Sequence, residues 1–531
     1  MAVAGGQPLQ DEAEDVQRKD KEEEEEVQLK RSLGVFDGVS IIVGVVVGSG
    51  IFVSPLGVLK STGSPGAALI VWALCGLLAL LGALCFAELG TSIKTSGGEY
   101  TYVRLAYGKL ASFLYIWVLV LVIIPCSNAI AALTFATYVL QPLFRTIDAT
   151  VSGVCSAAPP EQAVSLLALA ILMLLVYINC VSIEGSIKLQ GTFTSAKVLA
   201  LVSIISYGAY YLLAGNQVRS LDNSSAANGT TATEASGWFS GTATSLPQLA
   251  RAFYSGFFTY SGWTALNCVT EEIKRPERNM PRAIVASITG VTLIYILANL
   301  SYFAVLTRTQ ILNSDAIAVA FGEAALGVGP AKWIMPLAVA ASAIGGLNAS
   351  VFATSRVYLA AAREGQLFGT LSMISANRLT PLPALIFLGA TSAVYLSTTR
   401  VLLLIEYMTF VEATFATMAV STLLALRVKF PHLHRPLRVP LLVPLAYLAF
   451  SSLVVLLPLW TAPVEALAGT CIMLSGVPGY YLTAGWRAKP RLYQKAIDRM
   501  NIVAQKLTLS VRPTVNVEDE APTANDERHS D

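Results

Sequence analysis

The sequence predicts an all-α polytopic membrane protein with twelve transmembrane helices. Hydrophobic residues make up 54% of the 531 positions and charged residues 13%, and the mean hydropathy is +0.61. This composition is far more apolar than that of an average soluble domain. Apolar stretches of roughly the 20 residues that cross a hydrocarbon core recur along the chain. They lie near 36–58, 65–90, 110–140, 162–182, 192–214, 246–270, 283–306, 332–360, 382–398, 401–426, 440–461 and 464–484.

The distribution of charge predicts the orientation of these spans. Cations gather in the loops after the second, sixth, eighth and tenth spans, so the positive-inside rule places these loops and both termini in the cytoplasm. An acidic run at 22–26 precedes any apolar stretch, and we therefore expect no cleavable signal peptide. The sequence divides into an acidic N-terminal tail (1–33), a transmembrane domain (34–490) and a polar C-terminal tail (491–531), which we expect to be disordered beyond Pro513.

Small residues interrupt two of the apolar segments. Gly48-Ser49-Gly50 lies within Val39 to Leu59, and Ser261-Gly262 lies within Phe253 to Val269. A helix that stops inside hydrocarbon leaves backbone N–H and C=O groups unpaired, which is tolerated only where they line a polar cavity or meet a ligand. Two interrupted hydrophobic segments of this kind are the sequence pointer to a transporter binding site. The alternative is that these small residues only allow helices to pack closely.

The predicted outer loops carry two candidate modification sites. Cys155 lies between the third and fourth spans, whereas the other six cysteines lie in or beside apolar segments. An odd cysteine in an oxidising compartment indicates an intermolecular disulfide, and a free or buried thiol is the alternative. Asn223 and Asn228 begin glycosylation sequons in the polar loop after the fifth span. The same pattern at Asn299 and Asn348 falls inside apolar spans, where no oligosaccharide could attach.

Motifs for catalysis are nearly absent. The chain has three histidines and no HExxH, P-loop or CxxC spacing, so we expect no enzyme, metal site or other cofactor. The basic loops are explained by topology, and nothing supports nucleic-acid binding. A channel would need a continuous polar lining, whereas the spans contain isolated charges.

Several long motifs, in the same order, resemble the light chains of the heteromeric amino acid transporters. The match runs from about residue 34 to residue 490 and is most similar to the L-type and y+L-type exchangers of the amino acid-polyamine-organocation superfamily. The motifs are VGSGIFV at 47–53, ALCFAELG at 83–90, SGGEY at 96–100, YSGW at 260–263, TEEI at 270–273, PERNMP at 276–281 and AREG at 362–365.

This resemblance implies a leucine-transporter-like fold with broken helices 1 and 6. Its inverted repeats would span about 34–214 and 246–427, followed by helices 11 and 12. It also implies Na⁺-independent exchange of amino acids at the plasma membrane. As partner it implies a single-span glycoprotein heavy chain, because Cys155 matches the family's linking cysteine in position.

A broken helix offers complements to both charged groups of an amino acid. Free N–H groups after a break suit the carboxylate, and free carbonyls before a break suit the ammonium. We expect the carboxylate to lie on the backbone of Ser49, Gly50 and Ile51. Carbonyls near the breaks would take the ammonium, namely those of Val46 or Val47 and of Phe257 or Phe258. The resemblance also implies that Phe258 is an aromatic gate over the substrate, and ordinary packing of its ring is the alternative.

Lys197 is the only cation within the fifth span. An intramembrane cation is costly and by default indicates a functional site, although a lysine can also reach the interface with its long side chain. The resemblance implies that its ammonium takes the place of the Na⁺ that sodium-coupled relatives of the fold hold.

Selectivity is where the sequence departs from its relatives. Ile124 stands where y+L-type exchangers carry Glu and cystine/glutamate exchangers carry Arg, and Thr264, near Ser261, stands where y+L-type members carry Asp. Glu412 falls where L-type members have a neutral amide, and it either accepts a cationic side chain or stays neutral. We therefore predict an exchanger of mainly large neutral L-amino acids. The alternatives are an exchanger that also carries dibasic amino acids and an amino acid-sensing scaffold with little transport.

Overall fold

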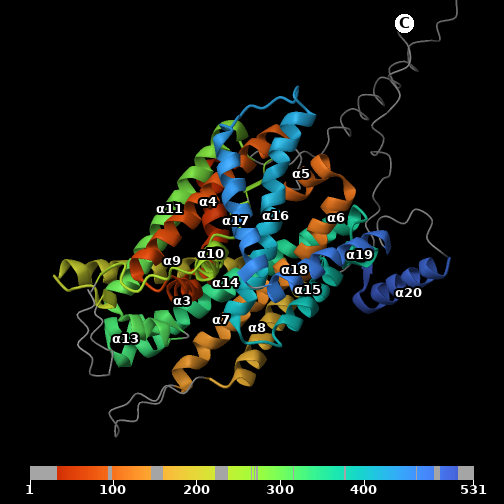
Figure 1. The fold of residues 1–531 in the computed structure, drawn as a ribbon. Helices are drawn as coiled ribbons and strands as arrows, with labels where there is room; N and C mark the ends of the chain where they lie inside the picture. The colour runs from red at the N-terminus through yellow and green to blue at the C-terminus, as the bar shows by residue number, and fades with distance from the viewer. Residues whose placement is uncertain are drawn as a thin grey trace, which may run out of the picture.

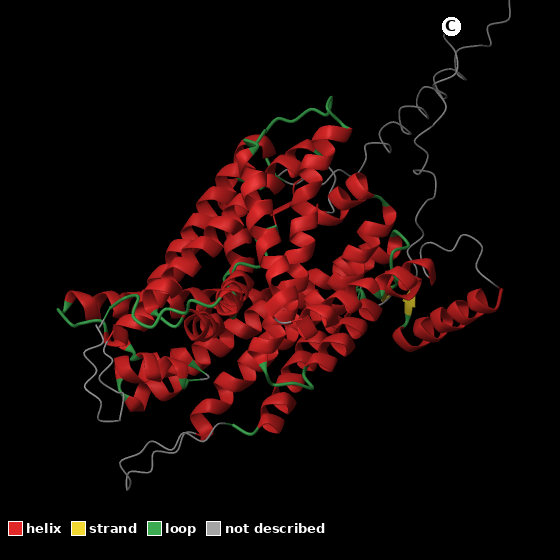
Figure 2. Ribbon diagram, in the orientation of Figure 1, coloured by secondary structure: helices red, strands yellow, loops and turns green. Residues whose placement is uncertain are grey.

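The computed structural model is almost entirely helical (Figures 1 and 2). It describes residues 33–93, 98–144, 159–221, 237–264, 266–267, 270, 273–314, 316–375, 378, 380–461, 463–482 and 491–511. The helices are α2 (Val35–Val46), α3 (Gly50–Thr62), α4 (Pro65–Ser92), α5 (Gly98–Tyr107), α6 (Lys109–Val118), the π-helix η1 (Leu119–Ile123), α7 (Ile124–Phe144), α8 (Glu161–Val181), α9 (Ile183–Leu213), η2 (Arg219–Leu221), α10 (Leu246–Thr259), α11 (Pro276–Val305), α12 (Arg308–Leu312), α13 (Ile317–Leu326), α14 (Val328–Arg363), η4 (Gly369–Ser372), α15 (Leu382–Tyr395), α16 (Val401–Lys429), α17 (Leu442–Thr461), α18 (Pro463–Leu474), α19 (Gly476–Leu482) and α20 (Arg491–Thr508).

Among the described residues, seven helices are long and apolar enough to cross a membrane, and the bent pair α2 and α3 makes an eighth candidate. Shorter apolar helices occupy 197–213, 382–395 and 466–482. The sequence predicts twelve spans, and the difference arises where a predicted span is broken or short. In the span predicted at 246–270 the described residues form the 14-residue α10 followed by turns, and in the one at 464–484 they are divided between α18 and α19.

The third span contains a local π-helix with a cause in the sequence. Pro125 has no N–H to donate to the carbonyl four residues earlier, that of Leu121. The hydroxyl of Tyr395 donates to this carbonyl instead, at 2.8 Å, and Tyr358 donates to the carbonyl of Val120 at 2.9 Å. The two tyrosines tie the π-helix η1 to α14 and α15, which lie near α7 in the centre of the molecule (Figure 1).

A buried ion pair joins α4 to the end of α16. Glu88 is fully buried, and its Oε1 accepts a hydrogen bond from Nε of Arg427 at 2.9 Å. Its Oε2 accepts one from the backbone N–H of Val439 at 2.7 Å. Arg435 adds a second cation at 3.9 Å from Oε1. The carboxylate is thus paired and hydrogen-bonded on both oxygens, as a buried charge requires.

Part of the predicted C-terminal tail is ordered against the bundle. Residues 491–508 form α20, which lies at one side of the molecule (Figure 1). The following strand β2 (Ser510–Val511) pairs antiparallel with β1 (Ile374–Ser375), and Thr370 donates to the side chain of Asn501 at 2.9 Å. Pro513 and the residues after it lie outside the described part of the chain.

Candidate functional site

The first break separates two helices that meet at an angle of 57°. α2 ends at Val46, and α3 begins at Gly50 after Val47, Gly48 and Ser49. The N–H of Phe52 donates to the carbonyl of Ser49 at 3.1 Å. Within the described part of the chain, the N–H groups of Gly50 and Ile51 have no hydrogen-bond acceptor. They are therefore two buried donors at the positive end of a helix, which favours an anion.

The second break ends α10 at Thr259. The N–H groups of Tyr260 and Ser261 turn back onto the carbonyls of Phe257 and Phe258 at 3.0 and 3.1 Å. Gly262 then adopts a φ of +93°, a conformation that side-chain-bearing residues rarely take. Both interruptions predicted from small residues are therefore breaks in helical structure.

The two breaks pack directly on each other. A Cβ added to Gly50 would lie 3.0 Å from the Cα of Thr259, and one added to Gly262 would lie 2.4 Å from Cγ1 of Val45. These glycines are needed because the backbones of the two broken helices approach closely. The close-packing explanation therefore holds at these glycines, at the same positions for which the sequence predicts a binding site.

A tyrosine from a third helix links the breaks. The hydroxyl of Tyr295 in α11 lies 2.9 Å from the carbonyl oxygen of Val46 and 3.2 Å from that of Thr259. The single hydroxyl hydrogen can serve only one of them at a time. A carbonyl has two lone pairs, so the carbonyl of Val46 can accept a second hydrogen bond. Sequence reasoning missed Tyr295 because nothing in its apolar helix marks it.

Glu412 reaches the second break from α16. Its Oε1 accepts a hydrogen bond of 2.6 Å from the hydroxyl of Ser261, while its buried Oε2 has no partner within the described structure. A second carboxylate lies nearby, because Glu99 interacts electrostatically with Glu412. Glu99 accepts a hydrogen bond of 2.7 Å from the hydroxyl of Tyr115. The SGGEY motif contains Glu99, but the motif alone does not predict this contact.

Lys197 extends from α9 to the end of α2. Its side chain is 1% exposed, and its ammonium donates to the carbonyl of Gly44 at 2.7 Å. The side chain therefore points into the bundle, which rules out the alternative that it reaches the membrane interface.

The adjacent rings of Phe257 and Phe258 belong to different parts of the core. Phe257 packs with the cluster that includes Tyr447 of α17, whereas Phe258 packs with residues such as Leu404 and Met408 of α16. Both rings are more than nine-tenths buried. Ile124 begins α7 beside the π-helix.

Three predicted sites fall on segments without a described structure. Cys155, Asn223 and Asn228 lie outside the described residues. The sequons at Asn299 and Asn348, by contrast, are fully buried in α11 and α14, as their apolar surroundings predict.

A bundle of apolar helices in which two broken helices face each other is typical of membrane transporters that bind a solute at the helix breaks. The fold therefore places this protein in that class. Residues 33–480 match the model of the amino acid permease family, and the chain belongs to this family. It is a family of permeases, so the expectation that the chain is not an enzyme is confirmed.

Individual relatives agree with this assignment. A large neutral amino acids transporter small subunit 2 from Oryctolagus cuniculus is 41% identical over 495 residues, which cover 92% of this chain and 87% of the relative. An Asc-type amino acid transporter 1 from Mus musculus is 39% identical, over 93% of this chain and 89% of the relative. A b(0,+)-type amino acid transporter 1 from Homo sapiens is 40% identical, over 89% and 94%. The resemblance to heteromeric transporter light chains is thereby confirmed.

Proposed function

We propose that the chain is a Na⁺-independent antiporter that exchanges L-amino acids, mainly large neutral ones, across the plasma membrane. The observation that carries the proposal is the pair of helix breaks in contact, where the N–H groups of Gly50 and Ile51 have no acceptor within the described structure. The names of the relatives support amino acids as the solute.

Each charged group of the substrate has a complement in this site. The carboxylate lies on the N–H groups at the start of α3, where the helix dipole and free donors add together. The ammonium meets the remaining lone pairs of the carbonyls of Val46 and of Phe257 or Phe258, beside the break in α10. Gly50, with no side chain, leaves space for the carboxylate to approach the backbone.

Neutral selectivity follows from the side chains near the breaks. Thr264 and Ile124 carry no charge, and Glu412 is engaged by the hydroxyl of Ser261 at 2.6 Å. In this proposal Glu412 is neutral, so it offers no fixed charge to a cationic side chain, and its Oε2 has no partner within the described structure. Phe258 serves as the gate over the substrate in this proposal.

Sodium independence follows from Lys197. Its ammonium already donates to the carbonyl of Gly44 at 2.7 Å, so a fixed charge stands where a coupling ion would otherwise neutralise carbonyl dipoles. A transporter with a built-in cation needs no ion gradient to complete its site.

The partner in this proposal is a single-span heavy chain linked through Cys155. The words "small subunit" in the name of the first relative support a second, larger subunit. Both termini are cytoplasmic, the outer loop carries glycans on Asn223 and Asn228, and the repeats span about 34–214 and 246–427.

Counterflow in proteoliposomes tests the function. Vesicles that contain the protein and are loaded with unlabelled leucine should accumulate labelled leucine, and empty vesicles should not. Labelled phenylalanine should enter in the same way, whereas labelled lysine should enter more slowly. Binding of leucine without any counterflow would contradict the proposal and favour a sensing scaffold.

A further inference from the structure

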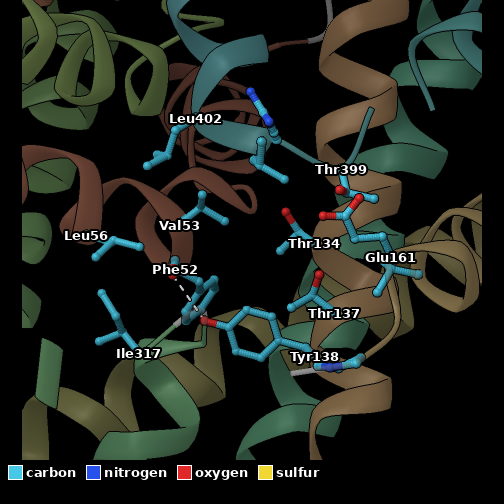
Figure 3. Close-up of a pocket in the computed structure, with 14 residues that line it drawn as sticks. Phe52, Val53, Leu56, Thr134, Thr137, Tyr138, Glu161, Ile317, Thr399 and Leu402 are labelled. Atoms are coloured by element: carbon cyan, nitrogen blue, oxygen red, sulfur yellow. Dashed lines mark hydrogen bonds between the residues drawn. The ribbon is translucent and has the colours of Figure 1, made fainter. Parts of the chain in front are cut away.

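A cavity of about 420 Å³ lies beside α3 on the side of the first break away from α2. Phe52, Val53 and Leu56 of α3 line it, together with residues of α7, α8 and the turn between α15 and α16 (Figure 3). The charge pattern of the loops assigns this side of the protein to the outside. None of the residues assigned above to the substrate lines the cavity.

The cavity has one polar and one apolar side. Figure 3 shows Glu161, Thr399, Thr134 and Thr137 along one side, and Phe52, Val53, Leu56 and Ile317 along the other. The hydroxyl of Tyr138 closes one end by donating to the carbonyl of Phe52 at 3.1 Å. A ligand that is polar at one end and apolar at the other would fit this lining, and the volume is within the range of small-molecule sites, about 300–1,000 Å³.

Two opposite charges line the same cavity from different elements. Glu161 is the first residue of α8, and Arg400 lies immediately before α16. Within the described part of the chain neither side chain has an ion-pair partner or a hydrogen bond. An anion and a cation held apart around one space complement a zwitterion, whose ammonium and carboxylate are themselves separated.

We propose that this cavity is a second amino acid site on the outer side of the transporter, in which Arg400 binds the substrate carboxylate and Glu161 its ammonium. The apolar side, formed by α3 and Ile317, takes the neutral side chain. The site rests on the proposed function for its ligand class. It captures an amino acid from outside before the substrate reaches the break at Gly50, about one helical turn away along α3.

Charge reversal at Arg400 separates this site from the central one. Arg400→Glu places a carboxylate against the substrate carboxylate, and we expect the external half-saturation concentration for leucine exchange to rise about tenfold, since the pair is exposed to solvent. The internal half-saturation concentration should stay within twofold. The double variant Glu161→Arg, Arg400→Glu should restore the external value, because a zwitterion can bind in the reverse direction.

Lys60→Glu is the matched control, because Lys60 is an exposed cation of α3 that does not line the cavity. It should leave both values within twofold. Equilibrium binding of labelled leucine should give two equivalents per wild-type chain and one in Arg400→Glu. A single equivalent in the wild type that Arg400→Glu does not alter, or equal changes at both faces, would overturn the second site. The proposed function fails separately, if wild-type vesicles show no counterflow at all.

Discussion

Gly50 lies where added volume would press the two breaks apart, because it faces the backbone of Thr259. A methyl group at this position would lie 3.0 Å from Cα, 3.1 Å from Cγ2 and 3.3 Å from Cβ of Thr259, which is tighter than ordinary van der Waals contact. Thr259 cannot rotate its Cα away, so α3 and α10 must move apart. Overpacking of this kind costs about 1–3 kcal/mol, which corresponds to about 5- to 150-fold in an equilibrium.

We therefore expect Gly50→Ala to lower the initial rate of leucine exchange by about 5- to 150-fold and Gly50→Val to abolish it. The valine side chain would also enter the space that the substrate carboxylate needs. The assay is counterflow of labelled leucine into proteoliposomes with equal amounts of monodisperse protein. Gly290→Ala in α11 is the matched control, because a methyl group there meets no atom within 4 Å. A Gly50→Ala rate within twofold of wild type would refute this account of the contact.

Four further predictions concern single side chains. Lys197→Ala should impair exchange at least tenfold, by loss of a charged hydrogen bond worth about 1.5–3 kcal/mol; wild-type uptake that scales with a Na⁺ gradient would contradict the role given to Lys197. Cys155→Ser should remove a reducible higher-mass band on gels when a heavy chain is co-expressed, and a persisting band would mean that another residue forms the link. Glu412→Gln should keep leucine exchange within about threefold, because the amide oxygen still accepts from Ser261, whereas Glu412→Ala should lose about tenfold or more; strong lysine competition that Glu412→Gln removes would show instead that Glu412 binds cationic substrates. Glu88→Ala should lower the stability by about 3–5 kcal/mol, measured by thermal unfolding in detergent, since it leaves Arg427 without its buried partner; an unchanged midpoint would refute this.

The sequence predicts the helix breaks well because their cause is local. Glycine and serine inside apolar stretches identify the positions at which α2 ends and α10 ends, and the structure confirms both. The number of spans is less predictable, since hydropathy does not distinguish one helix from two in succession, as at α18 and α19. The sequence also indicates Lys197 as a candidate functional residue, because a charged side chain is rare within an apolar span.

Contacts between distant segments were not predictable from composition or spacing. Tyr295 meets the carbonyl of Val46 across 249 positions of sequence, and Glu412 meets Ser261 across 151. A tyrosine in an apolar helix is ordinary in composition, and only the packing of α11 against both breaks gives its hydroxyl this place. The outer cavity is not predictable for the same reason, because Glu161 begins α8 and Arg400 precedes α16, and only the fold brings them to one space.

The central claim is that the two breaks bind an amino acid through its carboxylate and its ammonium. Competition by substrate analogues tests this claim most directly. Labelled leucine exchange would be measured against unlabelled leucine, 4-methylpentanoate, which lacks the ammonium, and 3-methylbutylamine, which lacks the carboxylate. Only leucine should inhibit at concentrations near its own half-saturation value, because each analogue leaves one set of backbone groups unpaired in the site. Inhibition by either analogue as strong as that by leucine would contradict the claim.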